Sequence, residues 1–253
     1  MRFPVRKNWL GHTKQWLEAL QALDFEVYPG EIFGLAGESG CGKTTLGRIV
    51  SRLIRQEKGS VWYRQRNLDT LPEADFRAVR REIQMVFQDP YSSLNPRMSI
   101  GQALLEPMRN YKLYGTDRNR KDKAVELLET VGMEAGHMDR FPSAFSGGQR
   151  QRICLARALT LQPKLLVCDE IVSALDVSVQ ATILNLLLDL REKFSLTYLF
   201  ISHDLSVIRQ MCDRLLIMNK GKIEAIGWPE ELLDHPTNDY VRGLIEAIPG
   251  KNR

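Results

Sequence analysis

A glycine-rich loop between a strand and a helix constrains the fold of this chain more than any other feature. Residues Gly37 to Thr44 match the pattern G-x-x-x-x-G-K-[ST]. The apolar run Ile32 to Ala36 enters the loop and predicts a buried strand, and apolar residues recur at helical spacing over 46–53. A strand, a glycine loop and a helix in this order predict an α/β core with a phosphate-binding loop (P-loop).

Backbone and side-chain donors set the chemistry of this loop. Its glycines let successive N–H groups point at phosphate oxygens, at the positive end of the following helix. We expect Lys43 to reach the β- and γ-phosphates and the Thr44 hydroxyl to bind Mg²⁺. The nucleotide contacts predicted in this segment are Gly37, Glu38, Ser39, Gly40, Cys41, Gly42, Lys43, Thr44 and Thr45.

Two acidic residues follow a second apolar run. Leu165 to Cys168 is continuous and apolar, as in central parallel strands, and Asp169 and Glu170 come directly after it. Beside a P-loop, Asp169 can hold Mg²⁺ through water, which is the Walker B role. Glu170 can polarise an attacking water as a general base.

Gln88 and His203 also end predicted strands. The Gln88 amide follows the run 83–87, where it can contact Mg²⁺ and sense the γ-phosphate. His203 follows the strand predicted at 197–201 and can hydrogen-bond the γ-phosphate. Either residue alone is more often structural, so the ordered set with the P-loop is what favours catalytic roles for both.

A second loop of small and polar residues precedes another helix. Its residues are Ser146, Gly147, Gly148 and Gln149. Backbone N–H groups and a serine hydroxyl at a helix N-terminus can form a second anion site, although the tetrapeptide by itself is typical of a capped helix start. Because the P-loop already serves the nucleotide of this chain, a second site is more useful to the nucleotide of a second molecule.

The composition is that of an ordinary globular chain, with 43% hydrophobic and 26% charged residues. A net charge of +4 does not by itself indicate nucleic-acid binding. The four cysteines contain no C-x-x-C pair, which suits a reducing compartment and no structural metal. No apolar run approaches the length of a membrane span or of a secretory signal, so we expect a cytosolic location, with a membrane reached only through a partner.

The remaining pattern indicates an α/β core interrupted by helices. Turn residues over 89–96 open a block, about 97–157, that is mostly helical. Further strands are predicted at 60–63, 83–87 and 197–201, a surface helix at 72–82, a core-facing helix at 179–194, and a hairpin at 215–226.

In combination these motifs resemble the ATP-binding-cassette (ABC) ATPases over nearly the whole chain. Their order is the P-loop, Gln88, the loop 146–149, Asp169 and Glu170, the segment 173–176, and His203. The resemblance implies a head-to-tail dimer in which each ATP lies between the P-loop of one chain and the signature loop of the other. It also implies that Ser146, Gly147 and Gly148 act in trans, and that Asp176 lies at the shared interface.

The segments 86–98, 145–152 and 172–180 resemble, within that family, the oligopeptide/dipeptide/nickel importer branch and its second ATPase paralogue. This implies a Mg²⁺-dependent ATPase on the cytoplasmic face of the membrane, without a transmembrane segment of its own. Its implied partners are a second ATPase subunit, identical or different, two permease subunits and, indirectly, a substrate-binding protein, with no nucleic acid. The transported solute stays open, because specificity lies in the other subunits.

The resemblance also implies a domain plan and some departures from the family. The whole chain forms one nucleotide-binding domain. Its P-loop NTPase core, about 1–90 and 158–230, has a mixed, RecA-like sheet and a small antiparallel part. A helical signature subdomain covers about 91–157, and a tail covers 231–253. Ile171 replaces the usual proline after Glu170, which could loosen that residue. The first strand of the family fold is nearly absent. Phe3 or a neighbour is the candidate for stacking on adenine. The C-terminal extension is short, and no cysteine follows Trp228.

Other classes remain open. A cassette ATPase of a soluble enzyme complex, such as a phosphonate-degrading assembly, is the main alternative. Cassettes that act on DNA or ribosomes usually carry coiled-coil, zinc or tandem-cassette additions that are not found in this sequence. A P-loop kinase would have no use for the loop 146–149.

Overall fold

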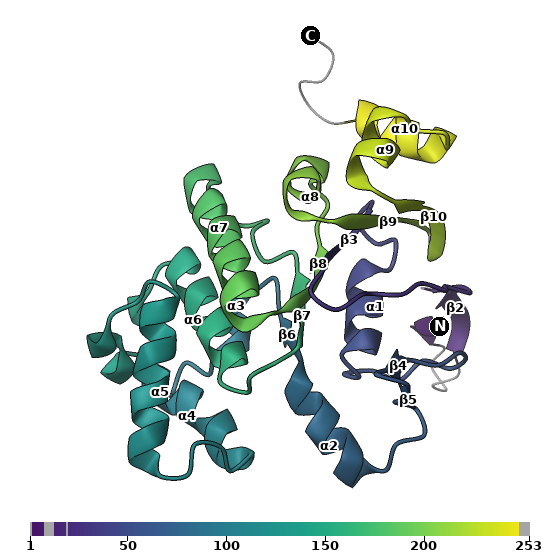
Figure 1. The fold of residues 1–253 in the computed structure, drawn as a ribbon. Coiled ribbons are helices and arrows are strands. Elements are labelled where there is room, and N and C mark those ends of the chain that lie inside the picture. The colour runs from purple at the N-terminus through teal and green to yellow at the C-terminus, as the bar shows by residue number, and fades with distance from the viewer. Residues whose placement is uncertain (1, 8–12, 19, 248–253) are drawn as a thin grey trace. The chain divides into compact units, whose positions relative to one another are not determined.

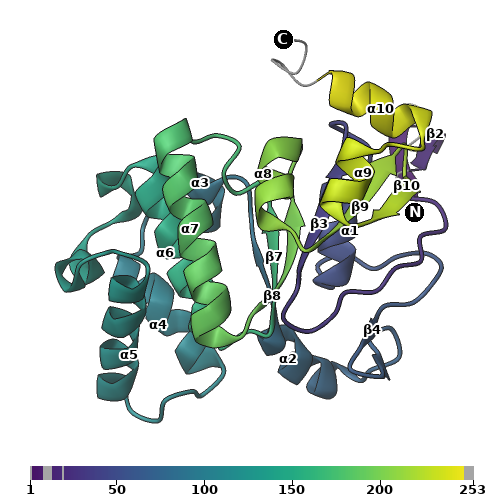
Figure 2. The ribbon, with the colours of Figure 1, turned by 45° about the horizontal axis from the view of Figure 1, so that its top comes forward.

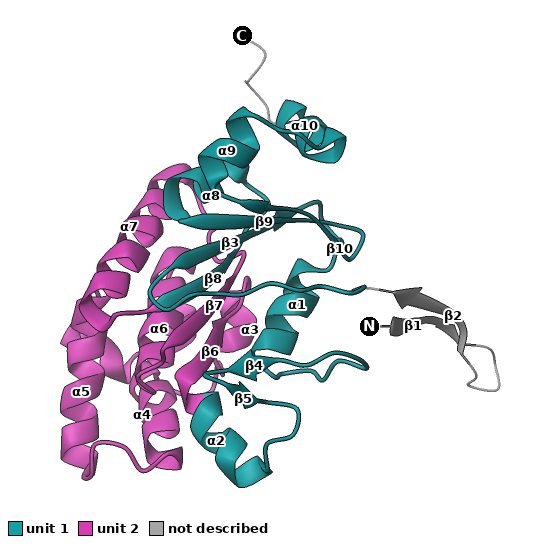
Figure 3. Ribbon diagram, turned by 45° about the vertical axis from the view of Figure 1, so that its right-hand side comes forward, with its two compact units in different colours: residues 1–80, 197–253 teal, residues 81–196 magenta. Residues whose placement is uncertain are grey.

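The computed structural model describes residues 2–7, 13–18 and 20–247, and side chains over 20–247. The chain divides into two compact units, unit 1 (residues 1–80 and 197–253) and unit 2 (residues 81–196), which are coloured separately in Figure 3. The P-loop and His203 belong to unit 1, whereas Gln88, Asp169, Glu170 and the loop 146–149 belong to unit 2.

Unit 1 is built on a mixed sheet. In spatial order its strands are β10 (Lys222–Gly227), β9 (Arg214–Asn219), β3 (Ile32–Gly37) and β8 (Thr197–Ile201). β3 is parallel to β8 and β9, and β10 returns antiparallel to β9, which confirms the predicted hairpin. All residues of β3 are buried, as its apolar sequence requires of a strand covered on both faces.

Helices and short strands complete unit 1. The helices are α1 (Lys43–Val50), α2 (Glu73–Glu82), α8 (Leu205–Met211), α9 (Pro229–Asp234) and α10 (Asp239–Glu246). The antiparallel pairs are β1 (Arg2–Lys7) with β2 (Thr13–Glu18), and β4 (Trp62–Tyr63) with β5 (Arg66–Asn67). α8 packs so closely on β3 that a Cβ at Gly34 would lie 2.8 Å from the Cys212 sulfur.

Unit 2 combines two parallel strands with a helical block. The strands are β6 (Ile83–Val86) and β7 (Leu165–Asp169). The helices are α3 (Pro90–Ser93), α4 (Ile100–Asn110), α5 (Asp117–Thr130), the 3₁₀ turns η1 (Ala135–Asp139) and η2 (Pro142–Ala144), α6 (Gly147–Leu159) and α7 (Val177–Phe194). Figure 1 shows α4, α5 and α6 side by side, and their core includes the buried Leu104, Met108, Leu127, Leu128 and Ile153.

The predicted fold class is confirmed: an α/β core with a small antiparallel part and an inserted helical block. The structure also contains elements that were not predicted from the sequence. Residues 2–7 form β1, where Pro4 lies beside an irregular register that tolerates a missing N–H donor. The near absence of the first strand of the family fold stays a prediction. The C-terminal residues after Trp228, which carry no clear pattern, form α9 and α10, which pack on β10 (Figure 2). The predicted subdomain boundaries stay a prediction.

Candidate functional site

The P-loop joins β3 to α1 within unit 1. Gly37 ends β3, and α1 begins at Lys43. Gly40 and Gly42 have φ of 81° and 112°, left-handed values that other residues rarely adopt. These two glycines therefore allow the chain to wind tightly into the helix, as a loop that presents its N–H groups to phosphate requires.

Lys43 lies within the loop that it serves. Its side chain is buried, and its Nζ donates to the carbonyl oxygens of Gly37 at 2.7 Å and Glu38 at 3.0 Å. Thr44 and Thr45 follow in the first turn of α1, which contains no acidic residue. The positive end of the α1 dipole is therefore not offset by a carboxylate of that turn, which favours an anion there.

His203 occupies the turn after β8, also in unit 1. Ser202 Oγ accepts from the Asp204 N–H at 3.0 Å, and the Asp204 carboxylate caps α8 by accepting from the N–H groups of Ser206 and Val207. His203 between them is exposed. The turn thus fixes the backbone of His203 and leaves its ring accessible to a ligand.

Gln88 and Glu170 come together in unit 2. Gln88 Nε2 donates to Glu170 Oε2 at 3.2 Å and to Ser173 Oγ at 3.2 Å. Ser173 Oγ donates in turn to the Glu170 carbonyl oxygen at 2.8 Å. Ser173 is a site residue whose role the sequence analysis did not identify; its position three residues after Glu170 is the spacing of a side-chain-stabilised turn.

The residues at the end of β7 and just after it differ sharply in exposure. Asp169 ends the strand and is 3% exposed, whereas the Glu170 side chain is partly exposed. Glu170 adopts a left-handed φ of 48°, a conformation uncommon outside glycine. The side chain of Ile171, at the position where proline was expected, is buried at 3% exposure, so apolar packing holds this turn.

The second glycine loop begins α6. Ser146 is the N-cap, and a reciprocal pair of bonds links it to Gln149: the Gln149 N–H donates to Ser146 Oγ at 3.4 Å, and the Ser146 N–H donates to Gln149 Oε1 at 3.0 Å. The first turn of α6 also contains no acidic residue. The loop is therefore a capped helix start, as the tetrapeptide suggests, whose serine hydroxyl still has a proton to donate to an anion.

Close packing restricts one of the two glycines of this second loop. A Cβ at Gly148 would lie 2.5 Å from Val179 Cγ1 on α7, whereas a Cβ at Gly147 would make an ordinary contact of 3.6 Å with Leu175.

Asp176 is the exposed N-cap of α7, and the next residue, Val177, is 83% exposed. An apolar side chain as exposed as Val177 is typical of surfaces that meet a partner.

An arginine links the segment after Gln88 to α6. The Arg150 guanidinium lies 3.7 Å from the centre of the Tyr91 ring, and its Nε donates to the Pro142 carbonyl at 2.7 Å. Arg157 Nη1 donates to the Ser93 carbonyl at 2.7 Å. The short helix that follows Gln88 is therefore held to the helix that begins with Ser146. Sequence reasoning did not find either arginine role.

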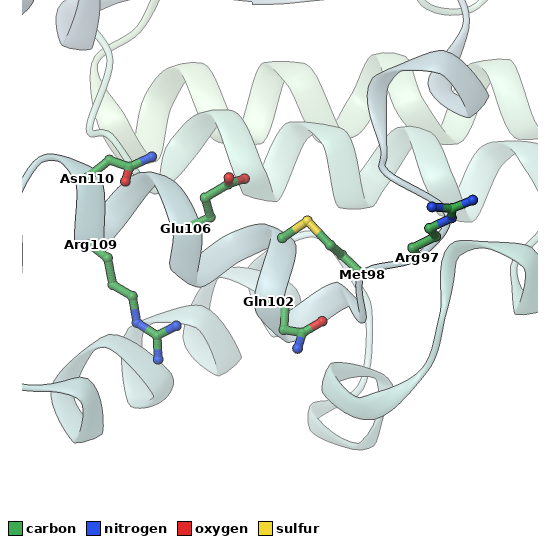
Figure 4. A pocket seen from close by; sticks show the side chains of 6 residues that line it. All are labelled: Arg97, Met98, Gln102, Glu106, Arg109 and Asn110. Atoms are coloured by element: carbon green, nitrogen blue, oxygen red, sulfur yellow. The ribbon is translucent and has the colours of Figure 1, made fainter.

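A surface groove of about 460 Å³ runs along α4 in unit 2. Figure 4 shows its lining side chains, which come from α4 and from the residues just before it. They are Arg97, Met98, Gln102, Glu106, Arg109 and Asn110.

The predicted site residues with described side chains thus fall into two sets, one in each unit. The side chain of Phe3, the candidate for stacking on adenine, lies outside the described residues. In the part of the chain that the structure describes, no helix combines the length and the apolar character needed to cross a membrane.

A P-loop that begins a helix after a buried parallel strand defines the class of P-loop nucleotide-binding proteins. The ABC transporter family profile matches residues 20–173 of this chain. The chain belongs to the ABC transporter family, as its motifs predicted.

Curated relatives and solved structures agree with this placement. The glutathione import ATP-binding protein GsiA of Escherichia coli (strain K12) is 44% identical over 98% of this chain, which spans only 40% of that protein's length. The oligopeptide transport ATP-binding protein AppF of Bacillus subtilis (strain 168) is 45% identical over 98% of this chain and 75% of its own length. The solved dimeric ATP-binding cassette MJ0796, bound to ADP and Pi, superposes with a TM-score of 0.77 at 27% identity, covering 90% of this chain and 97% of that structure.

Proposed function

We propose that the chain is a Mg²⁺-dependent ATPase subunit that powers the import of peptides, or of a related small solute, through a membrane permease. One observation carries the proposal: the chain has two helix N-termini without an acidic first turn, α1 with Lys43 and α6 with Ser146. Each presents backbone N–H groups suited to phosphate. Two such sites in one chain suit an enzyme that binds a nucleotide between two molecules.

Each predicted residue has a role in this proposal. The P-loop holds the ATP phosphates through its N–H groups and Lys43, and His203 donates to the γ-phosphate. Glu170 acts as general base on the attacking water, and its carboxylate is oriented by the hydrogen bond from Gln88.

The oxygen donors proposed for the metal are a Thr44 hydroxyl, the Gln88 amide and the Asp169 carboxylate. They fit Mg²⁺, which prefers hard oxygen ligands and keeps several waters. The nearly buried Asp169 carboxylate is consistent with a charge that a cation would offset. When bound, Mg²⁺ would neutralise developing charge on the phosphates.

We propose that Ser146, Gly147, Gly148 and Gln149 complete the ATP site of a second ATPase subunit. The dimeric assembly of the similar cassette MJ0796 supports this, as do the exposed Asp176 and Val177 at the start of α7. The second subunit is either another copy of this chain or a different ATPase subunit.

The permease is the second proposed partner. The names of GsiA and AppF, which describe import of glutathione and transport of oligopeptides, support an importer. We place the protein peripherally on the cytoplasmic face of the membrane, with a substrate-binding protein as an indirect partner and no nucleic acid. The groove along α4 is lined by residues that come after the Gln88 segment in the sequence. We propose that the groove binds the permease and transmits to it the movement caused by ATP binding and hydrolysis. The alternative, a subunit of a soluble enzyme complex, predicts co-purification with soluble enzymes instead of membrane permeases.

A complementation experiment tests the two-site mechanism. Ser146→Arg blocks the second loop, and Lys43→Ala removes the P-loop cation. Each variant alone should lose nearly all Mg²⁺-dependent ATP hydrolysis, whereas their mixture should recover a fraction, because one composite site contains two intact halves. A mixture as inactive as the separate variants, at concentrations where the wild type is active, would contradict action in trans. Equal activity of the wild type with Mg²⁺ and with excess EDTA would contradict the metal requirement.

A further inference from the structure

The P-loop is supported from behind by the C-terminal part of unit 1. The Gly221 N–H, in the turn between β9 and β10, donates to the Cys41 carbonyl at 2.9 Å. The Met218 carbonyl lies so close to Gly37 that a Cβ at Gly37 would collide with it. Backbone from β9 and its turn therefore touches the P-loop near its start and near its middle.

A tyrosine of α10 joins the same contact. The Tyr240 hydroxyl donates at 3.4 Å to the Met218 carbonyl, the same carbonyl that lies against Gly37. Burial raises the pKa of the Tyr240 phenol, so the hydroxyl keeps the proton that it donates.

A polar network fixes the helix that carries Tyr240. The Asn238 side chain caps α10 by accepting from the Tyr240 N–H at 2.8 Å, and its Nδ2 donates to Glu224 Oε2 at 3.2 Å. The other Glu224 oxygen accepts from Asn219 Nδ2 at 3.1 Å. Since Asn219 and Glu224 lie on β9 and β10, the N-terminus of α10 is tied to the hairpin whose turn contacts the P-loop.

The contact acts on the part of the loop that Lys43 uses. Lys43 Nζ binds the carbonyls of Gly37 and Glu38, and Tyr240 binds the Met218 carbonyl that lies against Gly37. We propose that Tyr240 is a positioning residue, whose hydroxyl holds the Met218 carbonyl against Gly37 and so keeps the start of the P-loop in the conformation that receives nucleotide phosphates. This inference rests on the proposed ATP-binding function. It predicts an effect on nucleotide binding without an effect on the chemical step, because Glu170 is not part of the contact.

Tyr240→Phe tests this role by removing only the hydroxyl. Tyr114→Phe is the matched control, since the Tyr114 hydroxyl also donates to a backbone carbonyl, that of Thr160 at 3.0 Å, far from the P-loop in sequence. We expect Tyr240→Phe to weaken MgATP and MgADP binding about two- to tenfold, the range for losing one net hydrogen bond. The KM for ATP should rise likewise while kcat stays within about twofold, and Tyr114→Phe should change neither. Asn238→Ala, which removes both the cap of α10 and the donor to Glu224, should reproduce the binding defect.

Hydrogen exchange of the nucleotide-free protein separates this inference from the proposed function. Tyr240→Phe should speed amide exchange over residues 37–41, and Tyr114→Phe should not. A wild type that binds no nucleotide would contradict the proposed function, and the exchange data would still decide whether Tyr240 holds the loop. A wild type that binds nucleotide, together with a Tyr240→Phe variant that matches it in affinity and in exchange over 37–41, would overturn the inference.

Discussion

The side-chain amide of Gln88 donates to the carboxylate of Glu170 across 3.2 Å, although the two residues are 82 positions apart in the chain. The same amide reaches Ser173 Oγ, which holds the Glu170 carbonyl. Glu170 is thus fixed at its backbone by the turn and at its side chain by the end of the neighbouring strand. If nucleotide binding moves the Gln88 side chain, that movement therefore acts directly on Glu170, the proposed base.

Glu170→Gln should retain ATP binding and lose hydrolysis. A glutamine keeps the size of the side chain and an oxygen for the Gln88 bond, but it cannot take a proton from water. Hydrolysis should fall by about 10²- to 10⁴-fold, the usual contribution of a general base, and ATP-bound dimer should accumulate. Steady-state phosphate release and size-exclusion chromatography with ATP measure the two effects.

Glu129→Gln is the control for this change, because Glu129 is an exposed residue of α5 and should leave the rate unaltered. Turnover of Glu170→Gln at the wild-type rate would refute the assignment of the base.

The two glycines of the second loop should differ in their tolerance of a methyl group. Gly148→Ala brings a Cβ to 2.5 Å from Val179 Cγ1, so the Val179 side chain or the α6–α7 packing must shift, at a cost of about 1–3 kcal/mol. Gly147→Ala meets only an ordinary contact at 3.6 Å and should stay within about 1 kcal/mol of the wild type, since alanine favours the helix. Denaturant unfolding monitored by circular dichroism compares them. Equal stabilities would mean that the α6–α7 packing at Gly148 is looser than the structure shows.

The Asp117 carboxylate should titrate well below its ordinary range. Hydrogen bonds from Arg109 and then Arg120 lower its pKa from 3.8 to about 2. A depressed pKa in the folded state contributes stability above the unfolded pKa, and that contribution is lost as the pH falls from about 4 to about 2. Asp117→Asn should therefore lower Tm slightly at pH 7, with a difference that shrinks toward pH 2 and in high salt, because the carboxylate is exposed. A difference in Tm that grows on acidification would contradict this.

The four thiols should be unreactive in the native protein. All are buried and unpaired, and burial raises the pKa of Cys154 to about 12 and also raises those of Cys41, Cys168 and Cys212. Since the thiolate is the reactive form, a disulfide reagent at pH 8 should modify almost none of them. The same reagent in guanidinium chloride should modify all four. Rapid modification of one native thiol would show that its segment opens locally.

Local sequence patterns determined the elements that carry the site. The glycines of the P-loop, the apolar strand before Asp169 and the capping sequence at Ser146 each specify their own conformation, through allowed φ values, burial and helix capping. Elements with weaker sequence patterns were not predicted. These are β1, which contains Pro4, and α9 and α10, which pack against β10.

The sequence by itself thus determined which residues are available for phosphate, metal and proton chemistry, because those motifs are contiguous and obey local rules. Only the tertiary structure decided which of them meet. Parallel pairing of β6 with β7 brings Gln88 to Glu170, and the packing of α10 on β10 brings Tyr240 to the Met218 carbonyl beside Gly37. Contacts between such distant segments depend on strand order and helix packing, and no local propensity encodes them.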